Sequence, residues 1–169
     1  FVRAFHNTYN LPTIISNCSN NYGPGQYPEK LIPLFITNII NNQSIPIYGD
    51  GKNVRDWLYV EDHVNALISH QNSKVSQENF CIGGNNPLTN LDLISFLVDS
   101  FNRINSKILD KNKVIKFIDD RKGHDQRYAV STTKFNQQFG ELNYKNFENN
   151  LKATIEFFQK QNVICQNIK

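Results

Sequence analysis

The segment from Ser19 to Leu31 constrains the fold of this chain more than any other. It is a polar loop punctuated by glycine and proline, Ser-Asn-Asn-Tyr-Gly-Pro-Gly-Gln-Tyr-Pro-Glu-Lys-Leu. An apolar, strand-like run over residues 13–18 precedes it, and apolar residues at helical spacing follow it. Open α/β folds bind ligands where a loop leaves the end of a buried strand. The amides, charged pair and aromatics of this loop suit a sugar or nucleotide better than a packed core.

The remaining periodicity predicts a mixed α/β fold with no repeat and no long linker. A helix over residues 1–9 ends at Asn10-Leu11-Pro12. Extended runs over 45–48 and 54–59 flank Gly49-Asp50-Gly51, a pattern that predicts a β-hairpin. Glu29 and Lys30 are expected in the first turn of the helix after the polar loop, with Pro28 near that turn. The other expected elements are helices from Val60, from a cap at Thr89 or Asn90, over 132–139 and from Phe147, and strands at 79–83 and 114–118.

Length and composition exclude several classes of protein. The chain has 169 residues, 39% of them hydrophobic and 20% charged, which predicts a globular domain or part of a larger one. The net charge of +3 is scattered, so it does not favour a nucleic-acid partner. No run is long enough to span a membrane. Cys18, Cys81 and Cys165 form no CxxC pair, and no signal peptide opens the chain. We therefore expect reduced thiols, a cytoplasmic location and no metal site.

No residue at position 1 marks a start of translation, because the chain holds no Met. Either an initiator was removed or the chain is an internal segment.

Three candidates suit a polar ligand or a base: the Asn20-Asn21 pair, Lys30 and Tyr48. Asn20 and Asn21 offer carbonyl acceptors and amide donors for hydroxyls or carboxamides, although turn chemistry explains them equally well. Lys30 lies at a helix N-terminus, where a cation is disfavoured unless it faces an anion. Tyr48 could stack on a base, but a cross-strand aromatic is the commoner role for a lone tyrosine.

Further candidates are cationic residues later in the chain. Arg55 lies in an apolar strand, and the side chain of Asp56 must point to the opposite face, so a phosphate or another acid is the expected partner of Arg55. The loop over residues 119–128 gathers positive charge around His124, although such charge runs are usually solvated surface. The sequence holds no GxGxxG dinucleotide motif, no P-loop and no GxSxG motif.

Four segments together resemble a known family. They are SNNYGPGQYPEKLIPL (19–34), PIYGDGKNVRDWLYVEDH (46–63), IGGNNPLTNLDL (82–93) and DRKGHDQRYAV (120–130). In this order and at these separations they resemble the C-terminal half of the dTDP-glucose 4,6-dehydratases, which are extended short-chain dehydrogenases/reductases. The resemblance covers essentially the whole chain.

The resemblance implies an α/β fold in which residues 1–22 are the tail of a Rossmann domain and the rest is a small mixed α/β substrate-binding domain. The NAD-binding N-terminal half would be absent from these residues. In that family NAD oxidises C4 of the sugar, water leaves across C5 and C6, and the hydride returns at C6. A Tyr-x-x-x-Lys pair on a helix and an Asp-Glu pair on a strand-end loop do this chemistry, and the resemblance places none of these catalytic residues in this chain. We therefore expect no catalytic residue in this chain, no turnover by these residues alone, and a homodimer for the full-length enzyme.

The family motif assigns binding roles to matching positions. Asn21 would contact the cofactor NAD. The residues expected to bind dTDP-glucose are Asn20, Lys30, Leu31, Pro46, Ile47, Tyr48, Arg55, Asn90, Asp120, Arg121 and His124. The alternatives are a UDP-glucose 4,6-dehydratase or epimerase-type enzyme, and a non-catalytic nucleotide-sugar-binding fragment. The run over 17–21 favours the dTDP enzymes. A sheet that misses most of its parallel strands would leave Ile14, Ile15 and the Phe1–Phe5 face without cover, so the chain is expected to aggregate or associate when expressed alone.

Overall fold

The computed structural model describes residues 1–69, 71 and 73–167, with side chains through Asn162, so the side chain of Cys165 lies outside the described part. The expected mixed α/β class is confirmed. In chain order the elements are α1 (Val2–Tyr9), β1 (Ile14–Cys18), β2 (Asn20–Tyr22), α2 (Leu31–Ile40), β3 (Ile45–Tyr48), β4 (Val54–Tyr59), α3 (Val60–Ser69), β5 (Glu78–Ile82), β6 (Pro87–Thr89), α4 (Asn90–Asn105), α5 (Lys111–Val114), β7 (Ile115–Ile118), β8 (Arg127–Tyr128), α6 (Thr133–Phe139) and α7 (Phe147–Asn167).

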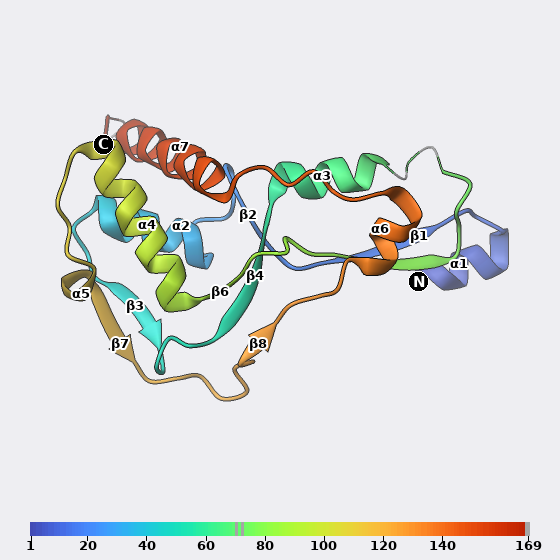
Figure 1. Cartoon of the computed structure of the whole chain (residues 1–169), viewed down its shortest axis with the longest axis horizontal. Coiled ribbons are helices and arrows are strands. Elements are labelled where there is room, and N and C mark those ends of the chain that lie inside the picture. The colour runs from blue at the N-terminus through green and yellow to red at the C-terminus, as the bar shows by residue number, and fades with distance from the viewer. Residues whose placement is uncertain (70, 72, 168–169) are drawn as a thin grey trace.

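Two hydrophobic cores lie at opposite ends of an elongated molecule (Figure 1). The larger core packs α2, α4 and α7 against β3 and β4, around fully buried residues such as Ile32, Leu93 and Leu151. The smaller core gathers Phe80, Phe135 and Ala66 from β5, α6 and α3. Strand β4 runs between the two ends and contributes side chains to both cores. Burial of apolar surface is the main driving force for each core.

The strands form three small sheets. β1 pairs with β5 in parallel, β3 pairs with β7 in parallel, and β4 pairs with β2 and β8 in parallel and with β6 antiparallel. The predicted hairpin between β3 and β4 is therefore wrong. Gly49 and Gly51 do adopt the positive φ of a tight turn. However, the backbone groups of this turn bond to distant segments, Gly49 N–H to the Ile118 carbonyl and Leu91 N–H to the Gly51 carbonyl.

Two helix starts are informative. The expectation that Glu29 and Lys30 lie in the first helical turn is wrong, because a turn closed by Lys30 N–H and the Tyr27 carbonyl precedes α2 and Lys30 is only its N-cap. The predicted cap of α4 is confirmed at Thr89, whose hydroxyl accepts from Asp92 N–H at 3.0 Å. The Asp92 carboxylate accepts in return from Thr89, which completes a capping box.

The N-terminal end carries an exposed apolar face. Phe1, Phe5 and Tyr9 of the α1 segment are 104%, 51% and 71% exposed, and β1 has a described partner strand on one edge alone. Ile14 and Ile15 are half-buried. This agrees with the uncovered face expected from the sequence, and the association of the chain that follows from it stays a prediction.

Candidate ligand-binding site

A cavity of 360 Å³ lies where the polar loop, the start of α2, β3, β4 and the loop before β8 meet. Ten of the eleven predicted substrate-binding residues line it: Asn20, Lys30, Leu31, Pro46, Ile47, Tyr48, Arg55, Asn90, Arg121 and His124. They come from segments up to about a hundred positions apart in the chain, and their convergence on one cavity is a property of the fold. Asp120 and Asn21 do not line it.

Strand β4 supplies the floor of the cavity through its alternation. Arg55 and Trp57 line the cavity, whereas Asp56 lies on the opposite face and is buried. The Asp56 carboxylate accepts from Gly84 N–H at 2.9 Å and from Asn86 N–H at 2.8 Å. The prediction that Asp56 points away from Arg55 is therefore confirmed, and Asp56 serves the loop after β5.

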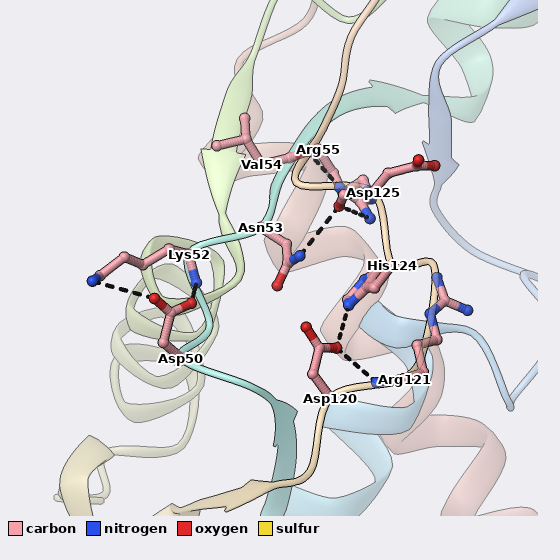
Figure 2. A network of polar contacts seen from close by, with 9 residues as sticks. All are labelled: Asp50, Lys52, Asn53, Val54, Arg55, Asp120, Arg121, His124 and Asp125. Carbon is pink, nitrogen blue, oxygen red and sulfur yellow. Dashed lines mark hydrogen bonds and ion pairs between the residues drawn. The ribbon is translucent and has the colours of Figure 1, made fainter.

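Arg55 holds the loop before β8 in place (Figure 2). Its Nη2 donates to the Asp125 carbonyl at 2.8 Å and its Nη1 to the Val54 carbonyl at 2.7 Å. Asn53 Nδ2 donates to the same Asp125 carbonyl at 3.2 Å. A guanidinium carries five N–H donors, so two carbonyl bonds leave it able to bind an anion in the cavity as well.

Asp120 orients His124 without lining the cavity (Figure 2). Its Oδ1 accepts from His124 Nδ1 at 2.7 Å and from Arg121 N–H at 2.9 Å. Because a carboxylate only accepts, His124 carries a proton on Nδ1. The ring of His124 also meets Tyr48 edge-on, with centroids 6.2 Å apart. Asp120 thus fixes two cavity residues, and its predicted direct contact with substrate stays a prediction.

The two asparagines of the polar loop differ in their surroundings. Asn20 lines the cavity, and its buried Oδ1 has no hydrogen-bond partner among the described residues; the same holds for Oδ1 of Asn90. Buried acceptors of this kind need donors, which the hydroxyls of a ligand would supply. Both ends of Asn21 are engaged within the chain: Nδ2 donates to the Ser19 carbonyl at 3.1 Å, and Oδ1 pairs with His63 Nδ1 at 2.8 Å. Burial lowers the pKa of His63 below 6.5, which favours the neutral ring.

The charges lining the cavity favour an anion. Lys30, Arg55 and Arg121 contribute cations, and Glu29 is the single carboxylate among the described lining residues. Guanidinium groups match phosphate oxygens in a bidentate arrangement. Pro46, Ile47 and Tyr48 add an apolar wall beside these cations.

Sequence reasoning missed four lining residues, Glu29, Leu34, Phe35 and Trp57. Three of the four follow from spacing. Leu34 and Phe35 lie four positions after Lys30 and Leu31, one turn further along α2. Trp57 lies two positions after Arg55 and therefore on the same face of β4. Glu29 was explained by the helix dipole alone.

The predicted contact of Asn21 with NAD stays a prediction. The described residues include no glycine-rich dinucleotide loop, and the side chain of Asn21 is held by Ser19 and His63. Among the described residues, no three His, Cys, Asp or Glu side chains gather in a way that could hold a metal ion. No described helix combines the length and the apolar character needed to cross a membrane.

Comparison with known proteins gives consistent results. Residues 1–154 match the family described as GDP-mannose 4,6 dehydratase. A dTDP-glucose 4,6-dehydratase of Escherichia coli is 42% identical over 168 residues, which cover 99% of this chain and 46% of that protein. The chain therefore spans about half the length of the curated relatives it matches.

Solved structures give the same answer. The dTDP-glucose 4,6-dehydratase DesIV from Streptomyces venezuelae, solved with NAD and TYD bound, is 37% identical with a TM-score of 0.87 over 96% of this chain and 48% of its own. A dTDP-glucose 4,6-dehydratase from Bacillus anthracis in complex with NAD is 39% identical, with a TM-score of 0.81 over 99% of this chain and 51% of its own.

Proposed function

Because the chain belongs to the GDP-mannose 4,6 dehydratase family, we propose that it is the nucleotide-sugar-binding half of a dTDP-glucose 4,6-dehydratase. The observation that carries this proposal is the convergence of Lys30, Arg55 and Arg121 on one cavity beside an apolar wall. A nucleoside diphosphate sugar presents the matching chemistry, which is two phosphates, a planar base and several hydroxyls.

The cavity divides naturally among the parts of this ligand. Arg55 and Arg121 bind the diphosphate, since guanidinium groups fit phosphate oxygens. Pro46, Ile47 and Tyr48 hold the thymine base against the apolar wall. The unpartnered carbonyl oxygens of Asn20 and Asn90 accept from hydroxyls of the ribose or the hexose. His124 completes the polar wall, and Asp120 sets its orientation.

The chemical step needs groups beyond those of this chain. NAD, when bound, accepts a hydride from the sugar and returns it. The described residues include no glycine-rich dinucleotide loop, so in this proposal most NAD-binding residues belong to the part of the relatives that lies outside the matched half. The polar loop, including Asn21, would then face that part. A homodimer, as the resemblance implies, belongs to the same proposal.

Calorimetry of the 169-residue chain tests this function directly. We expect saturable binding of dTDP, weaker binding of UDP at equal ionic strength, and no formation of a keto sugar from dTDP-glucose. Tighter binding of UDP would assign the chain to the UDP-sugar enzymes. If neither nucleotide binds, the cavity does not function as a nucleotide site in this chain and the proposal fails.

A further inference from the structure

A second, much smaller cavity lies behind the candidate site and shares a wall with it. It has a volume of about 30 Å³ and is lined by residues of β2, β4, α3, the loop after β5 and the segment before α7. Trp57 belongs to the lining of both this cavity and the larger one. Trp57 is 5% exposed, so it is almost fully shielded from solvent and separates the small cavity from the larger one.

Three of the residues that line the small cavity each have a buried polar atom without a hydrogen-bond partner among the described residues. These atoms are Nε1 of Trp57, Oδ1 of Asp62 and Nδ2 of Asn86. Each comes from a different element: β4, α3 and the loop after β5. A buried polar group without a partner costs about 1–3 kcal/mol, so three around one cavity call for a common partner.

The neighbouring side chains are already engaged elsewhere. Oδ2 of Asp62 accepts from Lys145 N–H at 3.3 Å, whereas the Lys145 ammonium pairs with Glu61 at the surface. The hydroxyl of Tyr144 donates to the Gly83 carbonyl at 2.8 Å. Burial, in turn, raises the pKa of Asp62, as expected for a carboxylate that lacks a full set of donors.

The geometry points to a bound water molecule that joins Trp57, Asp62 and Asn86. Two N–H donors exclude a cation, and the carboxylate of Asp62 excludes an anion. A cavity needs about 10–15 Å³ to hold one water, which must find two to four polar partners, and this cavity offers the volume and three partners. The water accepts from Trp57 Nε1 and Asn86 Nδ2 and donates to Asp62 Oδ1.

The water also makes Asp62 and Asn86 positioning residues for the candidate site. They hold the indole of Trp57 by its Nε1–H, and the same indole lines the nucleotide cavity. This second step rests on the proposed function, whereas the water site does not.

Trp57 is the single tryptophan of the chain, so its indole N–H gives one unambiguous proton resonance. We expect a rotating-frame cross-peak between this proton and water, opposite in sign to the diagonal, which separates a bound water from proton exchange. In Asn86→Leu, which removes a donor and fills the cavity, the cross-peak should disappear. Asn149→Leu, the same change at an exposed position of α7, should retain it. An indole proton without this cross-peak in the wild-type chain would overturn the water site.

Affinity for dTDP tests the positioning step separately. Asn86→Leu should raise the Kd for dTDP several-fold while Asn149→Leu leaves it unchanged. If the cross-peak is present but the wild-type chain does not bind dTDP, the water site stands and the proposed function fails. If dTDP binds equally well to both variants, the positioning role of Asn86 is refuted.

Discussion

Replacing Arg55 by alanine gives the sharpest test of the cavity. The guanidinium donates to the carbonyl oxygens of Val54 and Asp125 and lines the cavity with its remaining donors. A hydrogen bond to a charged partner contributes about 1.5–3 kcal/mol. Loss of the diphosphate contact should therefore raise the Kd for dTDP by about tenfold to about 150-fold.

The structure also predicts that this loss is not caused by unfolding. In Arg55→Ala the Asp125 carbonyl keeps its bond from Asn53 Nδ2 at 3.2 Å, so the loop before β8 stays attached. The free energy of unfolding should fall by about 1 kcal/mol, which is the net contribution of a typical hydrogen bond to stability. Arg55→Lys keeps the charge without the planar fork, and its Kd should lie between those of the wild type and of Arg55→Ala.

Titration calorimetry with dTDP at two salt concentrations measures these effects. Arg103→Ala is the matched control, because Arg103 is an exposed arginine that pairs with Glu148 on the surface of α4 and α7. Its Kd should equal that of the wild type. If Arg55→Ala binds dTDP within twofold of the wild type, Arg55 does not bind the diphosphate and its place in the cavity serves the loop alone.

Three further predictions follow from contacts around the site. Asp56→Asn should lower the free energy of unfolding by about 1–3 kcal/mol or more, because an amide cannot accept from both Gly84 N–H and Asn86 N–H; urea denaturation with unchanged stability would contradict this. Burial lowers the pKa of His63 below 6.5, so the unfolded chain takes up this proton first and stability should fall as pH drops below about 6.5. His63→Gln should make that fall shallower, and equal slopes for both proteins would refute it. Phe5→Glu should reduce association of the chain in sedimentation, whereas an already monomeric wild type would refute the exposed-face argument.

The sequence predicts the elements that local patterns control and misses those that depend on distant partners. The cap at Thr89 and the end of α6 at Gly140 are local, because each is decided by residues within one helical turn. The pairing of β3 with β7 is not local. Asp-Gly between two extended runs favours a hairpin. In the structure, however, Gly49 N–H bonds to the Ile118 carbonyl and Leu91 N–H bonds to the Gly51 carbonyl, and β3 and β4 lie in different sheets. The short strands β2, β6 and β8 are similarly defined by pairing with β4.

The cavity residues likewise divide into those that local sequence patterns predict and those that depend on contacts between distant segments. The motifs allow Arg55 and Arg121 to be proposed as ligand contacts, but no spacing places them together, since they are brought into one cavity by the folding of the loop before β8 onto β4. Conversely, Trp57 could have been found from the two-residue period of the strand that holds Arg55. The surroundings of Asn21 were inaccessible to sequence reasoning, because its partner His63 lies in α3, 42 positions away.

The alternation of β4 explains how one strand serves the cavity and both cores, because Trp57 lines the cavity and also belongs to the larger core. Trp57 and Tyr59 pack into the larger core, and Leu58 packs into the smaller one. A shift of one residue in the pairing of β4 would exchange these faces and turn the carboxylate of Asp56 toward the cavity in place of Arg55. This register shift would also place a negative carboxylate where the ligand is expected to carry a negative phosphate. The two cores therefore fix the register that gives the cavity its charge, and a mutation that loosens either core should weaken binding without touching the cavity wall.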